Sequence, residues 1–199
     1  SAFKQSGVLR ARSMEELFDL AASFATQPIP KSERVAVITN SGGPGIITTD
    51  SIEAHNLEMA RFSKETITAL RKGLPEESSL YNPVDVLGDA NAESYRFTLE
   101  KVLADENTDS VLILLSPTAV IDPEATAHII VDIKSHFPQK PIIAACMGGE
   151  SLTKVMKILN EGGIPAFTFP EAAVRSIKGM VNYAEVRKSL VKRKETELT

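Results

Sequence analysis

The sequence is poor in the residues that build disulfides, zinc sites and aromatic surfaces. Its 199 residues include one cysteine, three histidines, no tryptophan and 6% aromatic residues. A single cysteine, Cys146, excludes an internal disulfide and is typical of a reducing compartment, so we expect a cytoplasmic protein. One cysteine and three scattered histidines are too few for a zinc site. So few aromatic rings also argue against stacking on single-stranded nucleic acid.

Long apolar runs and a strong charge are absent as well. No run reaches the roughly 18 apolar residues that a transmembrane helix needs, so we expect no membrane span. The net charge is −4 and the isoelectric point is about 5.5, which argues against nucleic acid as the main partner. The hydrophobic fraction of 43% and the charged fraction of 24% are ordinary for a globular protein with a core of useful size.

Short apolar runs alternate with longer amphipathic segments along the chain. Strands of about five residues separated by helices of about ten or more are typical of parallel βαβ units. The strand-like runs are apolar throughout, as expected when helices cover both faces of a sheet. We therefore predict an α/β fold, a doubly wound, parallel, flavodoxin-like sheet of about five strands, over residues 32–199 with a C-terminal helix. Predicted strands and extended pieces cover 35–39, 57–62, 82–86, 110–115, 141–146 and 164–169, and predicted helices cover 46–55, 63–74, 92–103, 123–137, 151–160 and 170–190.

The first 27 residues form a separate unit in this pattern. Residues 7–15 follow the same order as 163–171: glycine, a short extended run, a capping position, an acidic residue and an amphipathic helix. Ser13 and Glu16 also form a capping box. We predict that residues 1–27 are the last strand and helix of a preceding domain. The alternative is a simple N-terminal helix packed on the main sheet.

Small residues follow the predicted strands. The strand-exit loops at 40–45, 85–89 and 147–150 carry glycine, and the loop at 116–122 begins Ser-Pro-Thr. In an open parallel sheet, ligands bind outside the carboxyl ends of the strands. Small residues let the main chain approach a ligand, and helix N-termini favour an anion. These loops are therefore candidates for a phosphate or carboxylate site, although a tight turn without a ligand explains the glycines too.

The common phosphate and nucleophile motifs fail when tested on this glycine-rich stretch. A dinucleotide fingerprint would use Gly43 and Gly45, but its third glycine is replaced by Thr48. A Walker loop needs a lysine that does not follow Gly45, and Ser41 lacks the neighbours of a nucleophile elbow.

Several segments, in the same order, resemble the ADP-forming acyl-CoA synthetases, relatives of succinyl-CoA synthetase that include ADP-forming acetate–CoA ligase. The resemblance covers nearly the whole chain, and residues 13–21 resemble the end of the family's preceding ligase domain. The segments are TNSGGPG at 39–45, NPVDVLGDA at 82–90, MGGES at 147–151, GIP at 163–165 and FPEAAVR at 169–175.

This resemblance implies a second ligase-type, flavodoxin-like domain of the α subunit or of a fused chain. The family converts an acyl acid, CoA and ATP into acyl-CoA, ADP and phosphate, through an acyl phosphate and a phosphorylated histidine. The histidine lies in the preceding domain, a CoA-binding domain lies before that, and an ATP-grasp part lies elsewhere or in a partner subunit. The whole protein would use CoA, ATP and Mg, whereas this chain alone would bind none of them and be inactive.

The resemblance also assigns the candidate site. No catalytic residue and no metal ligand is expected in this chain, and the histidines lie outside the glycine-rich loops. Asp85 and Asp89 either orient a loop or a ligand amide, or belong to a turn in which Asp89 caps the next helix. The residues expected to face the phosphohistidine and the acyl phosphate are Asn40, Ser41, Gly42, Gly43, Gly45, Ser116, Thr118 and Ala119, with Asn82, Asp85, Gly148 and Gly149 in supporting loops.

Two other functions stay open from the sequence. A similar region occurs in some protein lysine acetyltransferases as a regulatory acyl-CoA-binding module without ligase chemistry. A plain flavodoxin-like domain could instead bind FMN or act as a receiver, but Thr39 and Asn40 do not supply the paired acids that a receiver needs.

Overall fold

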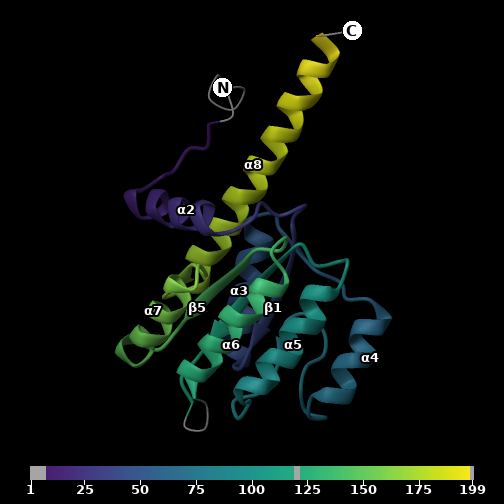
Figure 1. The fold of residues 1–199 in the computed structure, drawn as a ribbon, viewed down its shortest axis with the longest axis vertical. Helices are drawn as coiled ribbons and strands as arrows, with labels where there is room; N and C mark the ends of the chain where they lie inside the picture. Colours follow the sequence, from purple (N-terminus) through teal and green to yellow (C-terminus); the bar gives the residue numbers. More distant parts are fainter. Residues whose placement is uncertain (1–7, 119–121, 198–199) are drawn as a thin grey trace.

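One parallel sheet organises the chain in a computed structural model that describes residues 8–118 and 122–197. Helices cover both of its faces (Figure 1). In the described residues the sheet has six strands, which are β1 (Arg34–Thr39), β2 (Glu58–Met59), β3 (Val84–Asp85), β4 (Ser110–Leu115), β5 (Ile142–Cys146) and β6 (Ala166–Phe167). The helices in the same residues are α2 (Met14–Thr26), α3 (Gly42–Ala54), α4 (Lys64–Gly73), α5 (Ala92–Ala104), α6 (Pro123–His136), the short 3-10 helix η1 (Gly149–Leu152), α7 (Thr153–Glu161) and α8 (Pro170–Glu197).

The strand order confirms the doubly wound α/β prediction. It runs β2-β1-β4-β5-β6, and β3 pairs with the same edge of β1 as β2 does. All of these pairings are parallel. Strand β1 is therefore flanked by β4 on one side and by two short strands on the other.

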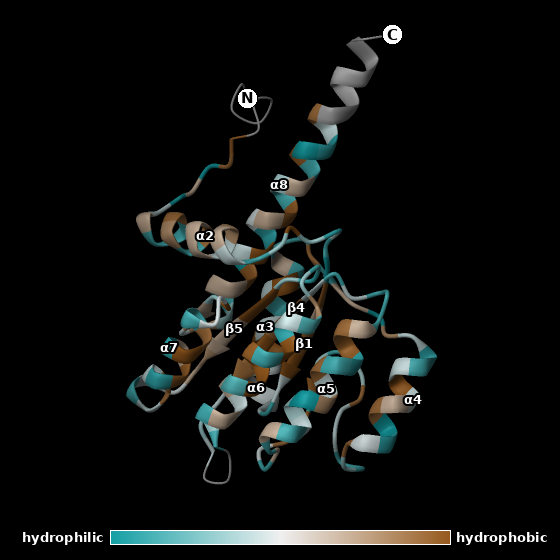
Figure 2. Cartoon of the chain, viewed as in Figure 1, coloured by the Kyte–Doolittle hydropathy of each residue, from teal (hydrophilic) through white to brown (hydrophobic). Residues whose placement is uncertain are grey.

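Both faces of the sheet are buried, because side chains alternate between two hydrophobic clusters. Ile38 and Ile113 point to the face that α4, α5, α6 and α7 cover. Val37 and Leu112 point to the opposite face, which α3 and α8 cover. Figure 2 shows the hydrophobic strands at the centre and hydrophilic residues along the outer helices. The uniformly apolar strands of the sequence thus reflect burial on two sides.

The side chain of Asn82 fills the gap between β2 and β3. Its Oδ1 accepts a hydrogen bond from the Val37 N–H at 2.8 Å, and its Nδ2 donates to the Val35 carbonyl at 2.8 Å and to the Ala60 carbonyl at 3.1 Å. The amide thereby supplies the donor and acceptor that a continuous neighbouring strand would give to β1.

Several element boundaries differ from those predicted. Strands β2 and β6 are each two residues long, shorter than the predicted runs at 57–62 and 164–169. Helix α3 begins at Gly42 and not at Ile46, and α8 continues to Glu197 beyond the predicted end at 190. A 3-10 turn from Gly149 precedes α7, where the sequence predicted a helix from Ser151.

Helix α2 packs on this domain. Leu20 and Ser23 are buried, and the Phe24 ring meets the Tyr183 ring of α8 edge to face at 5.3 Å. The Ser13 hydroxyl accepts from the Glu16 N–H, which is one half of the predicted capping box, whereas the Glu16 carboxylate accepts from the Arg12 N–H and not from Ser13. The Gln27 side chain accepts from the Ile142 N–H at 2.9 Å, which ties the end of α2 to β5. Residues 8–13 form no strand, and residues 1–7 of the predicted N-terminal unit lie outside the described residues.

Helix α8 starts at the carboxyl edge of the sheet and its far half extends beyond the amino edge (Figure 1). Among the helices of the described residues, none is both long and apolar enough to cross a membrane.

A buried ionic network closes the amino edge of β1 and β4. The Asp109 carboxylate accepts from Arg34 Nε at 2.6 Å and from Arg34 Nη2 at 2.9 Å, and it also accepts from the Ser32 hydroxyl. Asp109 is 3% exposed. Burial alone would raise the pKa of its carboxyl, but the hydrogen bonds from Arg34 and Ser32 outweigh burial and hold that pKa below its ordinary value of 3.8.

We expect the Asp109→Asn variant to lose about 2 kcal/mol of unfolding free energy at neutral pH, because the Arg34 pair loses its charge. A lowered carboxyl pKa stabilises the fold above the unfolded pKa, and this contribution disappears as the pH falls through the folded pKa. The difference between wild type and variant should therefore stay constant above about pH 5 and shrink as the pH falls below that value, through the lowered folded pKa. Urea unfolding at several pH values measures it. Asp50→Asn, which alters an exposed carboxylate on α3, is the control, and an equal difference at every pH would contradict the expectation.

Candidate functional site

The carboxyl ends of β1 and β4 lie side by side at the switch point of the sheet. The chain leaves β1 into α3 on one face and leaves β4 into α6 on the other, and Thr39 pairs with Leu114 in register. Open parallel sheets bind ligands at this point. The structure therefore brings together the loops at 40–45 and 116–118, which the sequence predicted from separate segments.

Asn40 joins these two loops. Its Nδ2 donates to the Ser116 carbonyl at 2.8 Å, and its Oδ1 accepts from the Ser116 N–H at 3.0 Å. The residue is 2% exposed. Both polar groups of the side chain are thus engaged within the protein, and Asn40 fixes the spacing of the loops.

The glycine-rich segment forms the first turn of α3 and is not a free loop. The Thr39 hydroxyl accepts from the Ser41 N–H at 3.0 Å and donates to the Ser41 carbonyl at 2.8 Å. The Ser41 side chain makes no capping hydrogen bond. The N–H groups of Gly42 and Gly43 belong to the first turn, where the helix offers no acceptor. Their position at a helix N-terminus favours a negative guest.

The three glycines of this turn have different surroundings. A Cβ on Gly45 would lie 3.3 Å from the Thr39 methyl, so this glycine permits close packing of α3 on β1. A Cβ on Gly42 would lie 3.6 Å from Asp85 Oδ2, whereas nothing lies within 4 Å of a Cβ on Gly43. Close packing therefore explains why residue 45 is a glycine. Among the described residues, no neighbouring atom lies close enough to require a glycine at position 43.

The loop after β3 borders the same edge. The Asp85 Oδ1 accepts from the Leu87 N–H at 2.9 Å. A Cβ on Gly88 would lie 3.8 Å from the Thr118 methyl and 3.9 Å from the Asn40 carbonyl oxygen. Asp89 does not cap α5, since Asn91 does so through its bond from the Ser94 N–H. The capping interpretation of Asp89 was therefore wrong, because α5 begins at Ala92 as predicted and the position directly before it is Asn91.

The loops after β4 and β5 complete the edge. The Thr118 hydroxyl is buried and has no hydrogen-bond partner among the described residues, and Ala119 lies outside them. A Cβ on Gly148 would lie 2.9 Å from both Leu152 and Pro117, so this glycine has a packing role. Gly149 has a positive φ of 56° and open space around it.

Asn82 does not join this group. Its amide is used along the middle of β1, between β2 and β3. Asn82 affects the edge only indirectly, because it holds β3 in position and the loop at 85–89 follows β3.

The single cysteine is buried, and the three histidines lie away from this edge. Burial raises the pKa of the Cys146 thiol to about 12, so the predicted small buried residue stays protonated. His55 follows the last residue of α3, and its Nδ1 lies 2.8 Å from the Ser51 carbonyl oxygen. His128 is exposed within α6 and His136 is its last residue. None of the three stands on the loops of the switch point.

The loops of this edge offer an anion main-chain N–H groups and hydroxyls but no basic side chain, and they also carry the carboxylates of Asp85, Asp89 and Glu150. The loops at 40–45, 85–89, 116–118 and 147–150 contain no lysine or arginine. An anion would therefore be held by main-chain N–H groups and hydroxyls. Within the described ranges no group of three or more His, Cys, Asp or Glu side chains could hold a metal ion.

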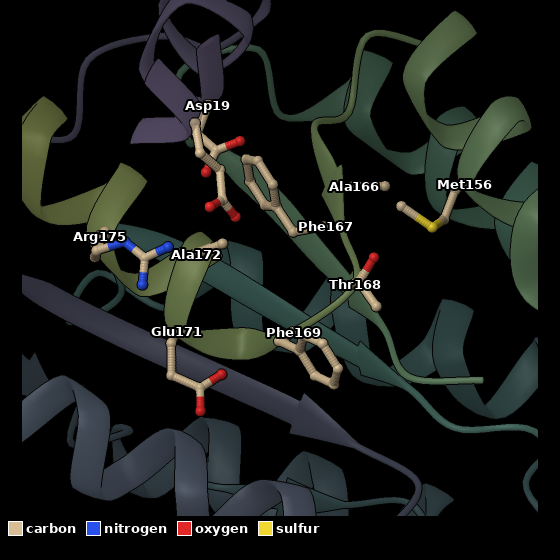
Figure 3. Close-up of a pocket in the computed structure, with 10 residues that line it drawn as sticks. Asp19, Met156, Ala166, Phe167, Thr168, Phe169, Glu171, Ala172 and Arg175 are labelled. Carbon is tan, nitrogen blue, oxygen red and sulfur yellow. The ribbon is translucent and has the colours of Figure 1, made fainter. Parts of the chain in front are cut away.

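A separate hollow of about 680 Å³ lies between α2, the edge strand β6 and the start of α8 (Figure 3). Asp19 and Glu15 of α2 and Arg175 of α8 border it, with the rings of Phe167 and Phe169. Burial and the nearby Glu15 raise the pKa of the Asp19 carboxyl. Strand β5 separates β6 from the switch point, so this hollow is distinct from the edge described above.

Sequence reasoning missed three residues at the switch point. Thr39 caps the turn with its hydroxyl, Leu87 carries a positive φ, and a Cβ on Gly88 would adjoin both neighbouring loops. Gly88 could have been included, because a glycine in a strand-exit loop was the signal used for the others. A left-handed leucine has no signature in a single sequence.

Comparison with known proteins gives a family and close relatives. A family model described as the Ligase-CoA domain matches residues 35–190. The chain is 41% identical over 186 residues to acetate–CoA ligase [ADP-forming] I of Archaeoglobus fulgidus, covering 94% of this chain and 26% of that protein. It is 37% identical over 188 residues to acetate–CoA ligase [ADP-forming] II subunit alpha of Pyrococcus furiosus, covering 93% of this chain and 41% of that subunit.

A solved structure shares the fold closely. It is the dinucleotide forming acetyl-coenzyme A synthetase 1 of Candidatus Korarchaeum cryptofilum in complex with phosphate and ADP. The TM-score is 0.89 at 33% identity, over 96% of this chain and 42% of that one. The chain thus spans less than half the length of these relatives.

We expect the Asn40→Ala variant to unfold about 2 kcal/mol more easily, because the Ser116 N–H and carbonyl lose their buried partners. Urea unfolding of the purified chain measures the change. Ser41→Ala is the matched control and should cost less than about 0.5 kcal/mol, since its side chain makes no capping bond. Equal effects of the two changes would contradict the bridging role of Asn40.

Proposed function

The chain belongs to the Ligase-CoA domain family, and on that premise we propose that it is a domain of an ADP-forming acyl-CoA synthetase. The whole protein would convert an acyl acid, CoA and ATP into acyl-CoA, ADP and phosphate. This chain would supply half of the phosphate-facing site at the switch point. The relatives reported above are named as ligases or synthetases, which favours this function over a regulatory acyl-CoA-binding module or an FMN domain.

The first turn of α3 carries the proposal. The N–H groups of Gly42 and Gly43 lie at a helix N-terminus beside the switch point, and the space around Gly43 is open. A phosphoryl group can approach main-chain donors only where no side chain stands in the way. The open space at Gly43 is the single observation that best fits an incoming phosphate.

The contribution of these residues would be electrostatic. Preorganised donors stabilise the charge of a phosphoryl group in the transition state, and the loss of one such donor costs about 2.7–4 kcal/mol in other enzymes. In this proposal Ser41, Ser116 and Thr118 add hydroxyls to the main-chain donors, and Gly149 adds backbone at the rim. Asn40, Asp85, Gly45 and Gly148 hold the loops in place.

The other parts of the reaction would come from outside this chain. The phosphorylated histidine and the CoA-binding domain would lie upstream, and an ATP-grasp domain or subunit would hold ATP and Mg²⁺. The single buried cysteine supports a cytoplasmic location for the whole protein.

The outer face of α2 supports an upstream neighbour. Met14, Leu17 and Phe18 are 65%, 48% and 66% exposed, although α2 already buries Leu20 and Ser23 against this domain. A helix that is apolar on both sides is normally buried on both sides. We therefore assign residues 1–27 to the boundary with the preceding domain, whose body would cover this face and adjoin the hollow of Figure 3.

The function is tested by acyl-CoA formation in the whole protein. With an acyl acid, CoA, ATP and Mg²⁺, it should release ADP and gain phosphate on a histidine upstream of this chain. The Gly43→Val variant should lower turnover about 100-fold, because its side chain stands where the phosphoryl group must approach. It should fold normally, since the space around Gly43 is empty.

Glu53→Ala, an exposed change at the other end of α3, is the matched control and should keep full turnover. Acyl-CoA formation by Gly43→Val at the wild-type rate would contradict the phosphate-facing role. Absence of any ATP-dependent acyl-CoA formation by the wild type would overturn the ligase proposal.

We expect the Phe18→Glu variant to lower the melting temperature of the whole protein by several degrees, because a charge would be buried against the preceding domain. The same change in the 199-residue chain should have little effect, since Phe18 is exposed there. Differential scanning calorimetry of both proteins measures the contrast. Thr68→Glu on the exposed face of α4 is the control, and a similar small effect of Phe18→Glu in both proteins would argue against the boundary.

A further inference from the structure

The loop after β3 contains a backbone conformation that its sequence disfavours. Leu87 has a φ of 73°. In this left-handed region the Cβ of an L-residue crowds the following carbonyl, and glycine or asparagine is normally found there. Asn56, at a φ of 51°, is such an ordinary case. A leucine persists in this region only where neighbouring interactions hold it.

Asp85 provides the holding interaction. Its Oδ1 accepts from the Leu87 N–H at 2.9 Å, and the Leu87 carbonyl accepts from the Ala90 N–H at 3.2 Å. Asp85 is itself fixed, because it pairs with Thr39 of β1 and its N–H donates to the Ser79 carbonyl. The left-handed turn is therefore anchored to the central strand through one carboxylate.

The turn places the main chain of Gly88 against both sides of the switch point. A Cβ on Gly88 would lie 3.8 Å from the Thr118 methyl and 3.9 Å from the Asn40 carbonyl oxygen, so a side chain at this position would adjoin both loops. The Asp85 Oδ2 faces the first turn of α3, at 3.6 Å from a Cβ on Gly42. The loop after β3 thus meets the loops after β1 and β4, beside the buried Thr118 hydroxyl.

We propose that Asp85 is a positioning residue of the phosphate-facing site, which acts through the left-handed turn at Leu87 to fix Gly88 between the loops after β1 and β4. This inference rests on the proposed ligase function. A carboxylate that touched the phosphoryl group directly would repel it. The bond to Leu87 gives the carboxylate a role that needs an acceptor atom and not a negative charge.

The experiment compares four variants in the whole protein. Asp85→Ala removes the acceptor, so Leu87 can leave the left-handed region and turnover should fall by about tenfold or more. Asp85→Asn keeps an acceptor oxygen and should retain roughly a third or more of the wild-type turnover. The double variant Asp85→Ala with Leu87→Gly should regain about threefold or more over Asp85→Ala, because glycine adopts the turn without help. Glu77→Ala removes an exposed carboxylate from the turn before β3, outside the loops of the switch point, and should keep the wild-type rate.

Two results would overturn the positioning role. One is a loss in Asp85→Asn as large as that in Asp85→Ala, which would show that the charge itself is required. The other is a double variant with no higher turnover than Asp85→Ala. This would show that Asp85 does not act on turnover through the left-handed turn at Leu87.

Amide hydrogen exchange separates this inference from the ligase proposal. In the 199-residue chain, the Leu87 N–H should exchange about tenfold faster in Asp85→Ala than in the wild type, and should stay protected in Asp85→Asn. If the wild-type whole protein forms no acyl-CoA, the proposed function fails while exchange still tests the turn. Equal exchange in all three proteins refutes the turn whatever the activity.

Discussion

The parallel pairing of β1 with β4 is the constraint on which the candidate site depends. It sets two chain segments, far apart in sequence, at one edge of the sheet and sends the chain to opposite faces beyond them. The Asn40 side chain then fixes their separation through two hydrogen bonds to Ser116. The pairing alone would bring the loops near each other, and the amide bridge makes their spacing a property of the fold.

Burial on both faces explains why so much of this fold could be predicted. The strands at 34–39 and 110–115 are apolar throughout and have helices on either side, so their type and order follow from pattern alone. Prediction was poorer where a tertiary contact decides the conformation. The helical turn at Gly42 depends on the Thr39 hydroxyl, and β3 depends on the Asn82 amide beside it. Neither of these side-chain contacts produces a periodic pattern in the sequence.

The glycines of the switch point show why composition alone could not assign the site. Gly45 and Gly148 are required because side chains crowd them, and this is a packing reason that needs no ligand. Gly43 has open space. The sequence marks all of them equally, and only the surroundings separate glycines that let helices pack from one that leaves room for a guest. The left-handed Leu87 lacks even the glycine signal.

The absence of lysine and arginine from these loops has a further consequence for how the site would work. Main-chain donors at a helix N-terminus carry only a partial charge, so free phosphate would be attracted weakly. A phosphoryl group attached to a docked neighbour avoids this weakness, because docking supplies the affinity and the donors need only stabilise the charge at the moment of transfer. A weakly charged cradle also releases its guest readily. This would suit the proposed role, in which the domain stabilises a phosphoryl group that its neighbour carries and never holds the group itself.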